Sequence, residues 1–276
     1  MSMAPQDFFP ALAPWVAGLD DTFPGAWIKP YFAQWEVLHI LSIALLGGAS
    51  ILLNLRLIGH GLTDESPSEV ERNVRPWLNL GVVGVIVSGL LIGSSNAERL
   101  YTSEAFTAKM LGLAAAIVLT YGVAMPAARR DGLLTGAGKL WAFVGLALFG
   151  LGLAVFGTAK LVNPGLWHVI LAAALIAGFV TRGALRIVYL LGLGALVIVQ
   201  TAATHVMIPA DDFARLDPVN KAFALAFAAW ILGMAGVQVT TSSRDDAAGP
   251  ATKALAYAAV LVWVMTAAAG RWIAFA

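Results

Sequence analysis

Cysteine is absent from all 276 residues of the chain, and charged residues make up only 12% of it. Without cysteine the protein has no disulfide, no thiolate metal site and no iron–sulfur cluster. Soluble domains carry about 25% charged residues, so the low charge content excludes an ordinary soluble domain. The formal net charge of +1 provides no basic patch to displace counterions, and we expect no nucleic-acid partner.

Hydrophobic residues, by contrast, make up 59% of the chain. After Pro30 they form eight apolar runs: 34–59, 76–96, 105–127, 138–160, 166–181, 185–208, 219–239 and 252–274. A membrane helix takes about 20 apolar residues. The pattern therefore predicts an all-α, polytopic transmembrane helix bundle of about eight helices. The short break at residues 181–186 indicates a tight hairpin between two helices. The polar residues 61–75 are predicted to form the longest cytoplasmic loop, and residues 211–221 an interfacial turn.

The first 30 residues have a different character from the bundle. Their apolar side chains recur at roughly helical spacing: Phe8, Phe9, Leu12, Trp15 and Val16. This spacing predicts a short amphipathic helix that lies on the extracytoplasmic membrane surface. With residues 1–30 as this segment and residues 31–276 as the helix bundle, we expect one transmembrane domain over residues 1–276.

The distribution of Lys and Arg indicates the orientation of the bundle. Alternating crossings place ten of the 17 on one side: Arg56, Arg72, Arg75, Arg129, Arg130, Lys139, Arg182, Arg186, Arg244 and Lys253. Cytoplasmic loops carry an excess of Lys and Arg, so this side is predicted to be the cytoplasm. Both termini are then extracytoplasmic.

Three of the four histidines fall at one depth in this topology. His39 lies near the start of the first apolar run, His168 at the start of the fifth, and His205 near the end of the sixth. All three positions lie in the outer half of the membrane. Polar groups inside a bilayer are costly and usually functional, although a buried histidine is also often just hydrogen-bonded to its neighbours. His60 lies at the cytoplasmic end of the first run, apart from the other three.

Histidine in a helix bundle suggests a metal or haem site. Neutral imidazole is the commonest protein ligand of metals. Two histidines on facing helices suit the axial positions of haem b, whereas all three could hold copper. The missing cysteines favour haem, with His39 and His205 as the first choice of axial ligands and His168 as the third candidate. Lys109 and Arg271 lie at the same level, where they either pair with haem propionates or extend to the lipid headgroups.

Several stretches of the sequence resemble a known group of proteins. These stretches are WEVLH at 35–39, LRLIG at 55–59, AFTAK at 105–109 and GRWIAF at 270–275. Together they resemble an uncharacterised bacterial family of polytopic inner-membrane proteins that is distantly similar to copper-resistance D (CopD-like) membrane proteins. The resemblance implies a bacterial inner-membrane location and a functional histidine on the first helix, which fits His39. It also implies either copper handling or a haem-bearing redox function near the outer face.

These observations lead to three functional hypotheses. The first is a membrane-embedded b-type haem protein that transfers electrons near the extracytoplasmic face, with a quinone or periplasmic redox partner; it would be a membrane oxidoreductase. The second is a copper-binding or copper-handling membrane protein that uses the same histidines. The third is a non-catalytic membrane partner subunit, and a homo-oligomer is compatible with all three. The sequence contains no nucleotide-binding loop or hydrolase motif.

Overall fold

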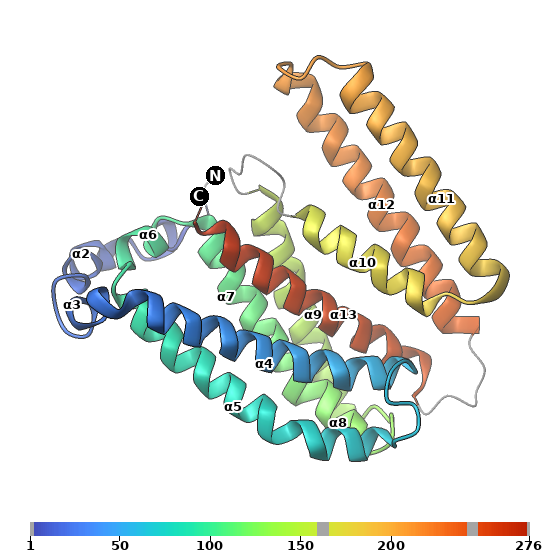
Figure 1. The fold of residues 1–276 in the computed structure, drawn as a ribbon, viewed down its shortest axis with the longest axis horizontal. Coiled ribbons are helices and arrows are strands. Elements are labelled where there is room, and N and C mark those ends of the chain that lie inside the picture. Colours follow the sequence, from blue (N-terminus) through green and yellow to red (C-terminus); the bar gives the residue numbers. More distant parts are fainter. Residues whose placement is uncertain (1–2, 159–165, 242–247, 275–276) are drawn as a thin grey trace. The chain divides into compact units, whose positions relative to one another are not determined.

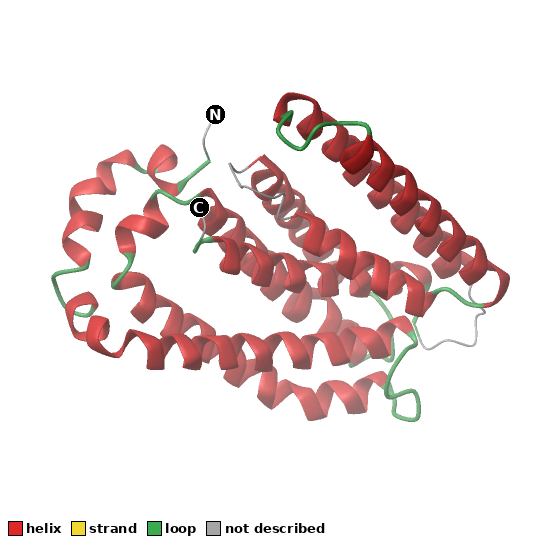
Figure 2. Cartoon of the chain, turned by 45° about the horizontal axis from the view of Figure 1, so that its top comes forward, coloured by secondary structure: helices red, strands yellow, loops and turns green. Residues whose placement is uncertain are grey.

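The computed structural model describes residues 3–158, 166–241 and 248–274, which form only helices and loops (Figures 1 and 2). Seven helices in this part are long and apolar enough to cross a membrane. They are α4 (Phe32–Ile58), α5 (Pro67–Ser94), α7 (Glu104–Ile117) with its continuation to Ala128, α9 (Gly136–Thr158), α11 (Gly183–Thr201) with its continuation to Val206, α12 (Phe213–Thr241) and α13 (Pro250–Trp272). The prediction of an all-α multi-pass membrane protein is confirmed.

The run predicted at residues 166–181 is also helical but short. Helix α10 (Leu166–Val180) has 15 residues in the described part, fewer than the roughly 20 that span a bilayer. The predicted tight hairpin follows it, because α11 begins at Gly183, only three residues after α10 ends. Gly183 has a φ of +59°, a conformation that glycine adopts without steric cost.

Two of the predicted loops are shorter than predicted, because helices begin inside them. Helix α5 begins at Pro67, within the loop predicted at 61–75, because Ser66 and Glu69 form a reciprocal capping box at its start. Helix α12 begins at Phe213, within the turn predicted at 211–221. The ion pair between Asp217 and Lys221, one helical turn apart at 2.6 Å, supports this first part of the helix.

The helices form two compact units, which we describe separately. Unit 1 comprises residues 1–165 and 247–276, and unit 2 comprises residues 166–246. Two helical units can both belong to one membrane domain, so the single domain over residues 1–276 stays a prediction.

Five long helices build unit 1, in which α4 packs on α5, α7 on α9, and α13 on both α4 and α7. Glycines permit close helix contacts. A Cβ added to Gly81 of α5 would lie 2.7 Å from the Cβ of Leu46, and one added to Gly112 of α7 would lie 2.5 Å from Oγ1 of Thr266. Small residues therefore let these helix backbones approach closely, as expected for packing inside a bilayer.

The first and last described residues, Met3 and Ala274, lie at the same end of unit 1, where Met3 N donates a hydrogen bond to Glu104 at the start of α7 (3.0 Å) and α13 ends. There the short helices α1 (Pro5–Phe8), α2 (Ala13–Leu19), α3 (Gly25–Ile28) and α6 (Ala97–Tyr101) contact one another and the helices α5 and α7 (Figure 1). The Tyr101 hydroxyl donates a hydrogen bond to the carbonyl of Phe9 (2.6 Å), and Arg99 donates one to the carbonyl of Ala274 (2.6 Å). We call this the terminal end of unit 1.

The opposite end of unit 1 carries a buried carboxylate. The side chain of Glu71 is only 1% exposed and forms ion pairs with Arg75 and with Arg129, the latter at 3.0 Å. The hydroxyl of Thr252, near the start of α13, donates a hydrogen bond to the carbonyl of Gly132 (2.9 Å). Helix α13 therefore begins at this end and runs to the terminal end.

Unit 2 consists of α10, α11 and α12, and α12 contacts both of the others. Tyr189 of α11 is completely buried, and its hydroxyl donates a hydrogen bond to the carbonyl of Ala174 in α10 (2.7 Å). The indole Nε1 of Trp230 in α12 donates one to the carbonyl of Tyr189 (3.1 Å). These contacts hold the three helices together.

Candidate functional site

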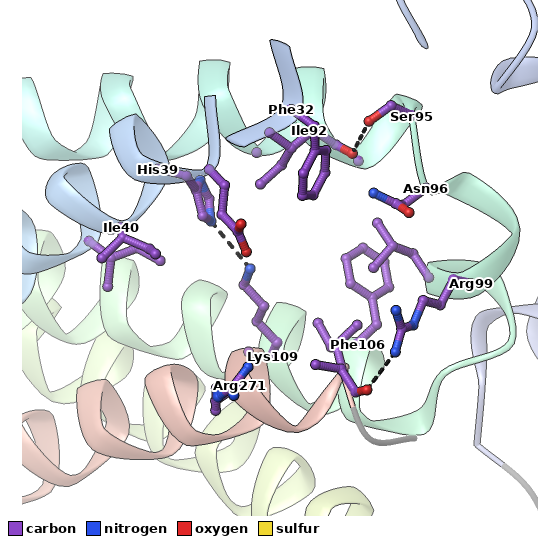
Figure 3. A pocket seen from close by; sticks show the side chains of 18 of the residues that line it. Phe32, His39, Ile40, Ile92, Ser95, Asn96, Arg99, Phe106, Lys109 and Arg271 are labelled. Atoms are coloured by element: carbon purple, nitrogen blue, oxygen red, sulfur yellow. Dashed lines mark hydrogen bonds between the residues drawn. The ribbon is translucent and has the colours of Figure 1, made fainter. Parts of the chain in front are cut away.

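A cavity of about 900 Å³ opens at the terminal end of unit 1 (Figure 3). It lies between the start of α4, the end of α5, the start of α7 and the end of α13. His39, Lys109 and Arg271 all line it, so three of the five predicted site residues meet in one cavity. Its volume is typical of a site for a small molecule or cofactor.

His39 is the most buried ionisable side chain of the cavity, with 5% of its surface exposed. Its Nδ1 lies 2.9 Å from the hydroxyl oxygen of Ser88 on α5, and the hydroxyl of Ser88 donates a hydrogen bond to the carbonyl of Gly84. On the other side of the ring, Nε2 lies 3.3 Å from the ammonium nitrogen of Lys109 (Figure 3). Both ring nitrogens of His39 thus have defined partners.

Glycine on α5 makes room for this ring. A Cβ added to Gly89 would lie 3.1 Å from Cε1 of His39, closer than side chains normally pack. The sequence Ser88-Gly89 therefore supplies both a hydroxyl for Nδ1 and a flat surface for the imidazole.

The charges around the cavity are mainly positive. Six charged side chains of the described part of the chain line it: Lys29, Arg99, Lys109, Arg271, Asp20 and Glu36. Lys29 is already paired with Asp20 (3.7 Å) and Asp21 (3.3 Å). Apolar side chains complete the lining, among them Phe32, Ile43, Ile92 and Phe106. A partly apolar cavity with excess positive charge suits an amphiphilic ligand that bears carboxylates or other anionic groups.

The other two predicted site residues, His168 and His205, belong to unit 2. His168 lies in the first turn of α10 and is exposed. His205 lies in the π-helical turn Ala202–Val206 that continues α11, and it is also exposed. Among the described residues, no group of three or more His, Asp or Glu side chains is arranged to hold a metal ion. The approach of all three histidines to one site stays a prediction.

Sequence reasoning missed Ser88 and Gly89. Both lie in the middle of an apolar run, about 50 residues after His39, and nothing in hydropathy or spacing links them to it. By contrast, the capping box at the start of α5 has a readable signal, because Ser66 is followed by glutamate three residues later.

Comparison with known proteins provides one match. Residues 16–136 match the model of a family of unknown function (DUF6644). This segment includes His39 and Lys109, which line the cavity, and Ser88, which contacts His39, but it ends before α13 and unit 2. No curated protein and no solved structure matches the chain.

Proposed function

We propose that this chain is a membrane-embedded haem b protein that transfers electrons near the extracytoplasmic face, with His39 as one axial ligand. The observation that carries the proposal is the surroundings of His39, a buried imidazole. Its Nδ1 is hydrogen-bonded to the Ser88 hydroxyl, while its Nε2 faces the Lys109 ammonium in a cavity large enough for a small-molecule ligand. Metal-ligating histidines typically use one nitrogen for the metal and the other for such a hydrogen bond.

Unit 1 contains the residues needed to hold a haem from one side: one axial ligand, an aromatic lining and positive charges for the propionates. His39 supplies an imidazole, Phe32 and Phe106 supply aromatic lining, and Lys109 and Arg271 supply charge for two propionates. Bound haem would supply a one-electron iron couple. The Nε2 lone pair of His39 serves one partner at a time, so a haem held by His39 would leave the Lys109 ammonium available to pair with a propionate.

The second axial ligand is proposed to be His205, with His168 as the other candidate. Unit 1 has no second histidine near the cavity, because its only other one, His60, follows the opposite end of α4. At a rise of about 1.5 Å per residue, the 21 positions from His39 to His60 correspond to roughly 30 Å. A copper site of three histidines would likewise need both histidines of unit 2, and no methionine is among the described residues that line the cavity.

The membrane orientation proposed from the whole sequence is supported by unit 1 alone. Seven Lys and Arg residues lie at the end away from the termini: Arg56, Arg72, Arg75, Arg129, Arg130, Lys139 and Lys253. Only four described ones lie at the terminal end: Lys29, Arg99, Lys109 and Arg271. The positive-inside rule then makes the terminal end, with its cavity, extracytoplasmic.

The number of crossings follows from the same geometry. Helix α9 runs towards the terminal end of unit 1, whereas α13 begins at the opposite end. An odd number of crossings between them fits this arrangement. With α11 and α12 long enough to cross, we propose that the shorter α10 completes a third crossing, which would give the eight predicted from the sequence.

Absorbance spectroscopy tests the proposed function. Protein expressed with ample haem supply and purified in detergent should show a Soret band and sharp bands after reduction. His39→Ala removes one iron–nitrogen bond, so haem should be lost or become high-spin. His60→Ala, at the other end of α4, is the matched control and should leave the spectrum unchanged. A wild-type preparation that stays colourless would overturn the proposal.

A further inference from the structure

His39 is held by a directional chain of hydrogen bonds. The single hydroxyl hydrogen of Ser88 goes to the carbonyl of Gly84, so its oxygen can only accept from His39 Nδ1. At Nε2 the partner is the Lys109 ammonium, which has three donors and no acceptor. Both contacts require the same form of the ring, with hydrogen on Nδ1 and a lone pair on Nε2.

The same arrangement recurs at His205 in unit 2. The hydroxyl of Thr204, a buried side chain, donates to the carbonyl of Gln200 one turn earlier (2.8 Å). The oxygen of that hydroxyl lies 2.8 Å from His205 Nδ1 and also accepts from the Gln200 amide at 3.4 Å. With its hydrogen used, Thr204 can only accept from Nδ1, so Nε2 of His205 again carries the lone pair.

We infer that Ser88 and Thr204 are positioning residues that hold His39 and His205 in the Nδ1–H tautomer, with Nε2 presented as a metal ligand. In each case a hydroxyl that is bonded to a helix carbonyl one turn back accepts from the imidazole. The hydrogen bond at one ring nitrogen determines which nitrogen of a histidine is free to bind a metal. The part of this inference that concerns iron ligation rests on the proposed function, whereas the tautomers themselves do not.

The local backbone fits this role at both sites. At His205, the π-helical turn Ala202–Val206 ends α11 and carries both the histidine and Thr204. At His39, the neighbouring Gly89 lets the ring lie against α5 within reach of Ser88. The two histidines belong to separate units, yet their rings are prepared for ligation in the same way.

Nuclear magnetic resonance of haem-free protein tests the tautomers directly. With only four histidines in the chain, ¹⁵N-histidine labelling gives a resolvable set of ring nitrogen shifts, measured where the rings are neutral. We expect protonated Nδ1 and unprotonated Nε2 for His39 and His205, assigned by His39→Gln and His205→Gln. Wild-type spectra with Nε2 protonated at both rings would overturn the inference without any variant.

Variants show whether the hydroxyls cause this state. Ser88→Ala should shift the Nδ1 resonance of His39 alone, because Nδ1–H loses its acceptor while the Lys109 ammonium still donates to Nε2. Thr204→Val should change the tautomer of His205 alone, whereas Ser88→Thr and Thr204→Ser should keep the wild-type pattern. Ser42→Ala is the matched control, because this α4 serine bonds to the carbonyl of Leu38 and not to His39. Ring nitrogen shifts that are identical in wild type and in folded Ser88→Ala and Thr204→Val protein would overturn the assigned role.

Haem titration separates this inference from the proposed function. If haem binds, Ser88→Ala should weaken its affinity about 10–100-fold, the usual effect of losing the hydrogen bond behind a ligating histidine. The Ser88→Thr variant should restore the affinity. If His39 and His205 are both in the Nδ1–H form but the protein binds no haem, the positioning role would be supported and the haem function overturned. Haem bound with unchanged affinity in Ser88→Ala would overturn the positioning role and support the function.

Discussion

The contact between Gly192 and Trp230 gives a stability prediction with a built-in control. A Cβ added to Gly192 would lie 2.1 Å from Cζ2 and 2.4 Å from Cε2 of Trp230, whereas carbon atoms pack at about 3.5–4.0 Å. The indole cannot simply turn aside, because its Nε1 donates to the carbonyl of Tyr189. Gly194, two residues along the same helix, has no atom within 4 Å of such a Cβ.

We expect Gly192→Ala to be less stable than Gly194→Ala by about 1.5–4.5 kcal/mol. Overpacking costs about 1–3 kcal/mol, and loss of the indole hydrogen bond costs about 0.5–1.5 kcal/mol more. The gain in helix propensity from replacing glycine by alanine is common to both variants in α11 and cancels in the difference.

Equilibrium unfolding in mixed detergent micelles, followed by tryptophan fluorescence, measures this difference. A double-mutant cycle with Trp230→Phe isolates the contact, since the smaller ring should reduce the cost of Gly192→Ala. Equal stability of Gly192→Ala and Gly194→Ala would refute the packing of α11 on α12. The result matters for function because α11 leads into the turn that carries His205.

Three further predictions concern unit 1. Glu71→Gln should destabilise the protein by about 2–3 kcal/mol, because it weakens the charge-assisted hydrogen bonds between a buried carboxylate and two half-exposed arginines. Asp217→Asn, which breaks an exposed ion pair, is the control and should cost no more than about 0.5 kcal/mol in the same unfolding assay. Equal costs of the two substitutions would contradict the structural role of Glu71. Introduced as the only cysteines, Glu98→Cys and Asp131→Cys should react with an impermeant thiol reagent from opposite sides of the membrane, and reaction from one side would disprove the topology. Arg271→Gln should speed haem loss without changing the ligation spectrum, and a changed spectrum would show that Arg271 does not act through the propionates.

The sequence alone was sufficient to predict the transmembrane helices and part of the candidate site. Apolar runs predict transmembrane helices well because backbone groups in lipid must be hydrogen-bonded within each segment. The alternation of crossings was enough to bring His39 and Lys109 to one end, although they are 70 residues apart. Helix starts were less well predicted, since α5 begins nine residues before the apolar run at 76, in a polar stretch with a capping box.

Only the tertiary structure revealed which side chains touch across helices. Ser88 meets His39, Arg129 meets Glu71, and Trp230 fills the space beside Gly192. Hydropathy gives the depth of a residue along a helix, but it does not give the rotation of that helix about its axis or its neighbours. Those are decided by close packing of small and large side chains between helices. The tautomer of His39 depends on such a contact between helices and therefore could not be read from the order of residues.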